Sequence, residues 1–311
     1  MKIAIVRRNG LGDLLAVMPL VLLCKERFPG CHVTLFVDQR NAPLLPYLRG
    51  FDEVVIIEPS KNKYVSLLKT ILKNRHREFD WVISARPTPM QWLNLFLRGL
   101  KTSRRRAVVD KSWHSRWINE PIQYEPHLQR HQMVKSLRLL DPSFEEVQSH
   151  LKPQLHVKPS RQFDQPTLLI SVSNHRIGSQ LDSDKIAHHL NRAFEKYPFQ
   201  VILNCEPSDL KRAEKVGEML RMKYEIIPTP DFDQFMGLLA SVDGSWTGDG
   251  GIMHLMGAFD KPQLVLFGKT ELWEWAPLSK KAICIRHPAN VNLIEKDVIQ
   301  KGVEDLICEL R

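Results

Sequence analysis

The sequence predicts an α/β protein with mostly parallel sheets, folded as two units. Short apolar strands alternate with helix-like segments along the whole chain, which is the pattern of a parallel sheet with crossover helices. Two of these strands end in glycine-containing loops that open a helix, at 7–13 and at 246–254. The length of 311 residues is sufficient for two domains that each bury a core of their own.

The first unit, residues 1–160, begins with an apolar strand at 3–6 and a helix from 14 to about 26. Further strands are expected, with helix-like segments between them, at 33–37, 54–57, 81–85 and 106–109. Residues 111–150 are less regular, with a helix-like run near 131–140. The polar segment 158–166 has a proline near each end, and we expect it to link the two units.

The second unit, residues 161–311, begins with a strand at 168–172. The remaining strands are expected at 201–204, 224–227, 244–247, 263–267 and 283–286. Helices are expected at 183–196, 209–221, 232–240, 251–259 and 297–310. Asp182-Ser183-Asp184 has the Asp-x-Asp form of a metal site, but it immediately precedes a helix, which favours an N-cap.

The loop before the helix at 251 has the properties of an anion site. Backbone N–H groups at a helix start are unpaired and carry the positive end of the helix dipole. Gly250 and Gly251 have no side chains, so a phosphate or diphosphate can approach this backbone closely. His254 lies one turn into the helix. The spacing alone leaves an ordinary strand–turn–helix connection as an equal alternative.

The N-terminal loop, Asn9-Gly10-Leu11-Gly12-Asp13, places a carboxylate at the start of the following helix. Asp13 can cap that helix, because Asp is a favoured residue at helix N-termini. It can also act as a general base at the carboxyl end of a parallel strand, where open α/β sheets bind their ligands.

Together, the two loops resemble those of glycosyltransferase family 9, the heptosyltransferases. The N-terminal loop is similar to the family's small-small-x-Gly-Asp and departs from it at the two small polar positions. Residues 249–254 match Asp-(Thr/Ser/Gly)-Gly-x-x-His, and 262–270 match the family's next segment, Pro-x-x-x-(Leu/Val)-(Phe/Tyr)-Gly-x-Thr. The resemblance implies a GT-B fold, with two Rossmann-like α/β/α domains facing across a cleft.

The resemblance also implies an inverting, metal-independent transfer of heptose from ADP-L-glycero-D-manno-heptose. Asp13 is the general base, the first unit binds the acceptor, and the second binds the donor. The donor-binding residues it implies are Asn9, Gly10, Gly12, Arg176, Glu206, Asp249, Gly250, Gly251, His254 and Thr270. Arg176 stands where the family has the lysine of a Lys-x-Trp motif and the tryptophan is missing, so its role and the donor sugar stay open. No cofactor is implied beyond the donor substrate.

Charge is distributed unevenly between the units. Residues 1–160 contain 26 Lys and Arg against 14 Asp and Glu, whereas residues 161–311 contain 18 against 21. The first unit is therefore expected to attract an anionic partner. The acceptor implied by the resemblance is anionic: Kdo, phospho-Kdo or heptose on lipid A, in the lipopolysaccharide inner core. Candidate acceptor-binding residues are Lys61, Lys63, Arg104 and Arg105. Reversing the charges of these residues and of Arg106 is expected to raise the acceptor KM and leave donor binding unchanged.

The five cysteines form no Cys-x-x-Cys pair and are expected to be reduced thiols of a cytoplasmic protein. No apolar run reaches 18 residues, so a membrane-spanning helix is not expected. The resemblance implies peripheral contact with the cytoplasmic face of the inner membrane, where the acceptor lies. Arg7-Arg8 before an apolar run is reminiscent of a secretion signal, but Asp13 interrupts it.

Three other functions are alternatives to this one. The sequence contains none of the usual nucleic-acid-binding motifs, which argues against a nucleic-acid-binding protein. A nucleotide-sugar epimerase needs a third glycine in the first loop, and this chain lacks it. An inactive binding module of the same fold stays possible.

Overall fold

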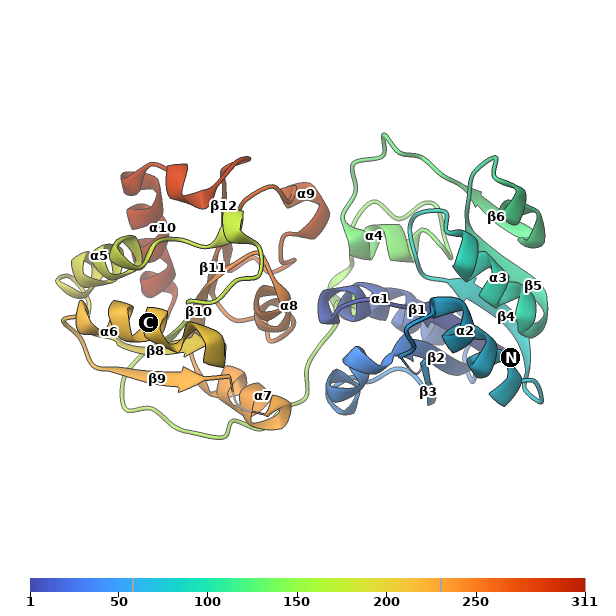
Figure 1. The fold of residues 1–311 in the computed structure, drawn as a ribbon, viewed down its shortest axis with the longest axis horizontal. Coiled ribbons are helices and arrows are strands. Elements are labelled where there is room, and N and C mark those ends of the chain that lie inside the picture. Colours follow the sequence, from blue (N-terminus) through green and yellow to red (C-terminus); the bar gives the residue numbers. More distant parts are fainter. Residues whose placement is uncertain (58, 230, 311) are drawn as a thin grey trace. The chain divides into compact units, whose positions relative to one another are not determined.

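The computed structural model describes residues 1–57, 59–229 and 231–310. The chain forms two units, Met1–Pro153 and Gln154–Arg311, so the boundary falls before the expected position at 160 and 161. Each unit contains a six-stranded sheet with helices packed against it (Figure 1). Every strand pairing among the described residues is parallel. The predicted α/β class with two Rossmann-like domains is confirmed.

In the first unit the strand order is β3-β2-β1-β4-β5-β6. The strands are β1 (Lys2–Arg7), β2 (His32–Asp38), β3 (Glu53–Ile57), β4 (Glu78–Ser84), β5 (Lys101–Val109) and β6 (Glu120–Gln123). The helices are α1 (Leu11–Arg27), α2 (Lys63–Lys73), α3 (Gln91–Gly99) and α4 (Gln132–Leu137), with short 3₁₀ segments at Gln39–Tyr47, Trp113–Trp117 and Ser149–Leu151.

Two strands in this unit differ from the sequence prediction, although the predicted strand at 106–109 lies within β5. β5 begins at Lys101 rather than at 106, and β6 lies in the stretch expected to be irregular. Glu120 on β6 pairs with Arg104 and Arg106 on β5. Both guanidinium groups also lie over the ring of Trp81 on β4, 4.1 and 4.4 Å from its centroid. These tertiary contacts stabilise a cationic run as a strand, although its local pattern is not that of a strand.

Helices cover both faces of this sheet because the direction of the right-handed crossovers changes at β1. α2 and α3 pack on one face, where Leu67 and Phe96 are buried with Ala4 and Val6 of β1. α1 lies on the other face and packs against α4, where Leu23 and Leu137 belong to a smaller cluster of buried residues.

In the second unit the strand order is β12-β11-β10-β7-β8-β9. The strands are β7 (Thr167–Ser171), β8 (Gln200–Cys205), β9 (Tyr224–Pro228), β10 (Gly244–Gly248), β11 (Gln263–Phe267) and β12 (Ala282–Arg286). The helices are α5 (Ser183–Phe194), α6 (Leu210–Glu218), α7 (Phe232–Ser241), α8 (Gly251–Ala258), α9 (Leu272–Trp275) and α10 (Lys296–Glu309), with 3₁₀ segments at Ile177–Ser179, Pro207–Asp209 and Val291–Leu293.

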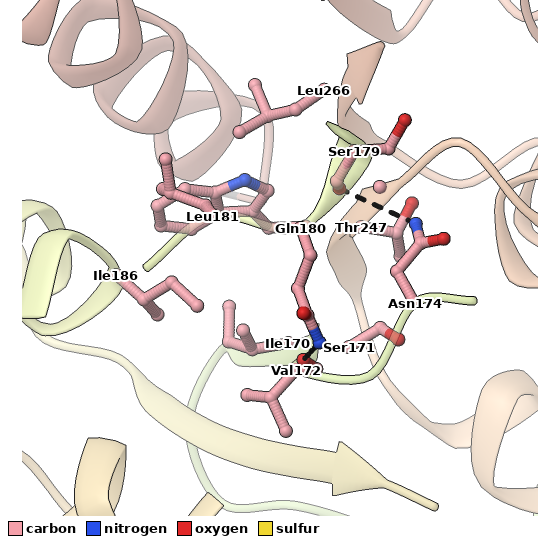
Figure 2. A pocket seen from close by; sticks show the side chains of 12 residues that line it. Ile170, Ser171, Val172, Asn174, Ser179, Gln180, Leu181, Ile186, Thr247 and Leu266 are labelled. Atoms are coloured by element: carbon pink, nitrogen blue, oxygen red, sulfur yellow. Dashed lines mark hydrogen bonds between the residues drawn. The ribbon is translucent and has the colours of Figure 1, made fainter. Parts of the chain in front are cut away.

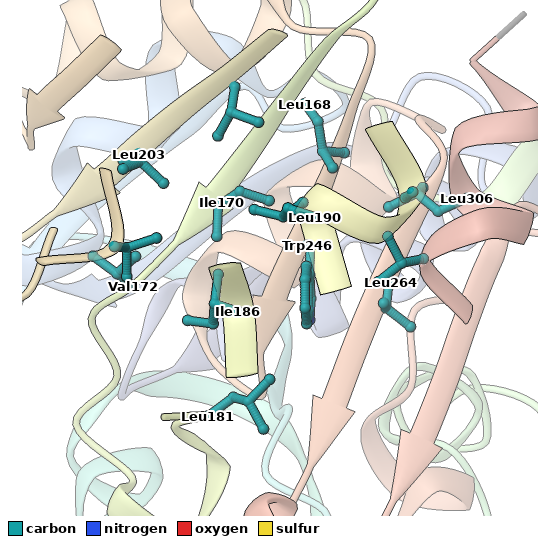
Figure 3. Close-up of a cluster of buried hydrophobic side chains, with 14 of the residues drawn as sticks. Leu168, Ile170, Val172, Leu181, Ile186, Leu190, Leu203, Trp246, Leu264 and Leu306 are labelled. Carbon is teal, nitrogen blue, oxygen red and sulfur yellow. The ribbon is translucent and has the colours of Figure 1, made fainter. Parts of the chain in front are cut away.

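The main core of the second unit lies between its sheet and the helices α5, α6 and α10. Figure 3 shows Trp246 of β10 among Leu190 of α5, Leu264 of β11 and Leu306 of α10. Trp246 is 3% exposed, so the tryptophan that opens the glycine loop is a core residue. Its packing fixes the end of β10, and with it the start of the loop.

The polar segment 158–166 lies within the second unit rather than between the units. The N–H of Ser160 donates to the carbonyl of Gly237 at 3.2 Å and to the hydroxyl of Ser241 at 3.0 Å. A Cβ on Gly237 would lie 2.8 Å from the Cβ of Ser160, so the segment contacts α7 closely.

Candidate functional site

Both glycine loops lie where an open parallel sheet binds ligands. That place is outside the carboxyl ends of the strands, where the strand order changes direction. In the first unit the change falls between β1 and β4, which are followed by the loops 8–10 and 85–90. In the second it falls between β7 and β10, which are followed by the loops 172–182 and 249–250. Each loop is therefore at the switch point of its own sheet.

Asp13 caps α1 and is held by an ion pair. Its Oδ2 accepts a hydrogen bond from the N–H of Gly10 at 3.1 Å, which completes the capping interaction. Its Oδ1 pairs with the Arg7 guanidinium, which also donates to the carbonyl of Ala85 at 2.6 Å. Burial lowers the pKa of Arg7, and the Asp13 charge opposes that effect. The Asp13 side chain stays 21% exposed, and each carboxylate oxygen keeps acceptor capacity, so capping does not prevent contact with a substrate hydroxyl.

Asn9 has a backbone conformation that non-glycine residues rarely adopt, with φ at 97°. Asp38, at the end of β2, stabilises it by accepting from the Asn9 N–H at 2.9 Å and from Nε of Arg8 at 2.5 Å. Gly10 follows as the N-cap of α1, and Gly12 lies inside its first turn. The expected helix therefore begins at Leu11, earlier than predicted.

The start of α8 has open space in front of its backbone. Gly250 is the N-cap and Gly251 the first helical residue. A Cβ on Gly251 would have no heavy atom within 4 Å among its described neighbours, and one on Gly250 would meet only the Gly248 carbonyl at 3.9 Å. Neither glycine is required by packing inside the chain. The open space therefore leaves the N–H groups of this helix end accessible to an anion.

Three of the predicted donor-binding residues meet at this helix start. Arg176, from the loop after β7, pairs with the buried carboxylate of Asp249. The same guanidinium donates to the Thr270 hydroxyl at 2.9 Å. Asn174 donates to the Asp249 carbonyl at 3.2 Å. The Arg176 side chain is 58% exposed, so it has further N–H donors available to an anion.

Glu206 lies on the neighbouring loop, after β8. Its N–H donates to the Ser173 hydroxyl at 2.9 Å, and its carboxylate is 2.9 Å from Nε2 of His175. The Glu206 side chain is 44% exposed, so it can also reach a ligand. His254 is in the second turn of α8, and its ring meets that of Trp275 edge-on, with the centroids 5.5 Å apart.

A small pocket lies behind the loops, between β7, β10 and α5 (Figure 2). Asn174, Ser179 and Thr247 line one side of it, and Leu181 and Ile186 the other. Its volume of about 20 Å³ is that of a single water, so it is no site for a nucleotide.

The predicted acceptor residues differ in their surroundings. Arg104 pairs with Glu120, and Arg105 donates to the carbonyls of Leu97 and Leu100 at 3.1 and 3.4 Å. Burial lowers the pKa of Arg105. Lys61 and Lys63 are exposed near the start of α2 and make no ion pair with the carboxylates of the described residues.

Among the residues that the structure describes, no three His, Cys, Asp or Glu side chains gather as a metal site would require. Asp182 is the N-cap residue of α5, as expected, although its carboxylate makes no capping hydrogen bond and lies 3.6 Å from Lys185.

The residues that support both loops carry no motif of their own in the sequence. The sequence shows Arg7 only as part of a basic pair, and it predicts no role for Asp38, Asn174 or His175. Arg7 and Asp38 are polar residues at the carboxyl ends of β1 and β2, and Asn174 and His175 lie in the loop that follows β7. That position is the signal that could have identified them.

Comparison with known proteins identifies similar chains. Residues 75–301 match the model of glycosyltransferase family 9 (heptosyltransferase). A family 9 glycosyl transferase from Veillonella parvula has a TM-score of 0.82 at 15% identity, covering 99% of this chain and 97% of that one. E. coli ADP-heptose LPS heptosyltransferase II gives 0.78 at 16% identity, with 99% of both chains covered. E. coli heptosyltransferase WaaC with ADP has a TM-score of 0.76 at 15% identity, covering 98% of this chain and 100% of that one.

These structures share the two-domain GT-B fold, so the fold predicted from the resemblance is confirmed. No curated protein matches the chain. In the described part of the chain, every helix is too short or too polar to cross a bilayer.

Proposed function

The chain belongs to glycosyltransferase family 9, the heptosyltransferases, and we propose that it transfers heptose from ADP-L-glycero-D-manno-heptose to the lipopolysaccharide inner core. The acceptor sugar is Kdo, phospho-Kdo or a heptose on lipid A. Membership of this family establishes that the chain is a glycosyltransferase. The donor, the acceptor and the residue roles below are our proposal.

The observation that carries the proposal is the cluster of Arg176, Asp249 and Thr270 beside the open start of α8. A nucleoside diphosphate needs N–H donors and positive charge, which the helix end and the guanidinium both supply. E. coli WaaC, whose fold is similar, was solved with ADP. The diphosphate then meets the N–H groups of Gly250 and Gly251, and Glu206 binds the ribose hydroxyls.

In the first unit, Asp13 acts as the general base. It takes the proton from the acceptor hydroxyl while that oxygen attacks the anomeric carbon, and the bond from this carbon to the ADP oxygen breaks. Direct displacement inverts the anomeric configuration. General base catalysis typically contributes about 10²–10⁴-fold. Arg7 holds the carboxylate in place through its ion pair.

ADP leaves with a full negative charge on its terminal phosphate oxygen. The dipole of α8 and the Arg176 guanidinium stabilise that charge without reorganisation. His254, Thr270 and Asp249 lie around the space that the ADP phosphates occupy. Asp249 orients the donor through its ion pair with Arg176. Arginine in place of a lysine allows bidentate contact with phosphate. A second candidate, transfer of another nucleotide-activated sugar, is favoured by this departure from the family pattern.

The acceptor we propose is part of an anionic lipid, which agrees with the basic composition of the first unit. The enzyme then works in the cytoplasm, peripherally bound at the cytoplasmic face of the inner membrane. Lys61, Lys63, Arg104 and Arg105 remain predicted acceptor contacts.

The test is ADP release from ADP-heptose with purified lipid A carrying Kdo or phospho-Kdo, compared between the wild-type chain and Asp13→Asn. We expect acceptor-dependent release that falls at least about 10²-fold in the variant, with ADP affinity unchanged. Asp164→Asn is the matched control, because Asp164 is an exposed aspartate that lies outside the site loops.

The outcomes separate the parts of the proposal. ADP binding without release points to another acceptor or another sugar on the donor. Failure to bind ADP contradicts the donor site itself. Full activity in Asp13→Asn refutes the assignment of the base while leaving the transferase.

A further inference from the structure

Helix α2 presents large apolar side chains to solvent. The four residues concerned are exposed by 41–56%, and they are Tyr64, Val65, Leu68 and Leu72. Their spacing places them together on one side of the helix. The buried residues of α2, Ser66, Leu67 and Thr70, lie on the opposite side.

The inner side of α2 is sufficient to hold the helix on the sheet. Leu67 is 3% exposed and belongs to the core of the first unit. Ile71 packs so closely on α3 that a Cβ on Gly99 would lie 2.4 Å from its Cδ1. Asn62 caps the helix by accepting from the Tyr64 N–H at 2.9 Å. The apolar outer side therefore contributes little to folding, and its hydrophobicity needs another explanation.

The surrounding segment carries positive charge only. Residues 59–77 contain four Lys and two Arg and no Asp or Glu. Arg77 pairs with Glu53 on β3. Lys69 and Lys73 are exposed and line a hollow between α2 and β3. An apolar stripe bordered by lysines is the pattern of a helix that lies in the interface of an anionic bilayer.

The charge decides between a bilayer and a second copy of the chain. A symmetric contact through α2 would bring two segments of the same positive sign together, which is unfavourable. Anionic lipid headgroups complement that charge, and their acyl chains complement the apolar stripe.

We propose that the outer face of α2 docks the protein on an anionic membrane. Leu68 and Leu72 enter the headgroup–acyl boundary, and Lys69 and Lys73 contact lipid phosphates. This inference deepens the proposed function, on which it rests for a lipid-borne acceptor, by naming the surface that meets the lipid.

The test is co-sedimentation of the full chain with phosphatidylglycerol–phosphatidylethanolamine vesicles and with phosphatidylcholine vesicles. We expect binding to the anionic vesicles only, weakened at least about tenfold by the double variant Leu68→Ser, Leu72→Ser. Leu293→Ser is the matched control, because Leu293 is 62% exposed in the second unit. Neutralising Lys69 and Lys73 to Gln is expected to weaken binding and reduce its salt dependence.

A second measurement reports insertion directly. Cys308 is the exposed cysteine, so Leu68→Cys in a Cys308→Ser background accepts an environment-sensitive fluorophore at the apolar face. We expect a blue shift on adding anionic vesicles. Unchanged emission, together with unchanged binding of the double serine variant, overturns the inference. A dimer that the double variant abolishes, without vesicle binding, assigns the face to a second copy and also overturns it.

ADP affinity distinguishes this result from failure of the proposed function. A chain that binds ADP and releases it from ADP-heptose but ignores vesicles refutes only the docking surface. A chain that docks through α2 but binds no ADP refutes only the donor site.

Discussion

The two glycines at either end of the 248–251 loop are expected to respond oppositely to alanine. Gly251 faces open space, whereas a Cβ on Gly248 would lie 2.3 Å from both the Asn174 amide nitrogen and the Ser179 carbonyl oxygen. One substitution therefore tests the donor site and the other tests packing. Both add the same methyl group, so each is the control for the other.

Gly251→Ala is expected to retain or raise stability. Alanine at a compatible helix position stabilises by about 0.4–1 kcal/mol, which corresponds to a Tm increase of roughly 1–4 °C for a domain of this size. The new methyl group occupies the space beside the N–H groups of α8. Losing one hydrogen bond to a charged group costs about 1.5–3 kcal/mol, so the Kd for ADP should rise roughly 10–100-fold.

Gly248→Ala is expected to lower stability. The Asn174 side chain can rotate away, but the Ser179 carbonyl belongs to the backbone, so the loop after β7 must shift. Overpacking of this kind costs about 1–3 kcal/mol, which corresponds to a Tm decrease of roughly 2–12 °C. Thermal melts measure the change in Tm, and calorimetric titration with ADP measures the change in ADP affinity. Gly251→Ala with unchanged ADP affinity refutes the assignment of the helix end to the diphosphate.

Two further outcomes are expected. Arg7→Met should lower kcat roughly tenfold or more with ADP affinity unchanged, because Asp13 loses its ion-pair partner. Arg7→Lys should recover part of the loss. Equal activity of the wild-type chain and both variants contradicts the positioning role of Arg7. His189 is buried against Gln300, and burial lowers its pKa below the ordinary 6.5. The unfolded chain therefore binds more protons, and stability is full above about pH 6.5 and declines as the pH falls towards the folded pKa. Urea unfolding at pH 7.5 and 5.5 measures the free energy of unfolding, which should change less with pH in His189→Phe than in the wild-type chain. An equal loss of stability in the two chains contradicts the role of His189.

Much of the fold was predictable because its signals are local. Parallel strands buried on both faces appear as short apolar runs, and the runs at 3–6 and 263–267 are where β1 and β11 lie. Both glycine loops could also be recognised, since a strand, a small-residue turn and a helix follow one another in the sequence. Capping by Asp13 was one of two predicted roles, and the structure shows it without excluding the other.

Only the tertiary structure decided which polar groups meet. Arg176, Asp249 and Thr270 come from three loops that are far apart in the sequence and converge because β7, β10 and β11 are neighbours. The same holds for Arg104 in β5, which is a strand residue because Glu120 and Trp81 lie beside it. Periodicity records which side of an element is buried, but pairing between distant charges depends on strand order, and strand order is set by the packing of the whole domain.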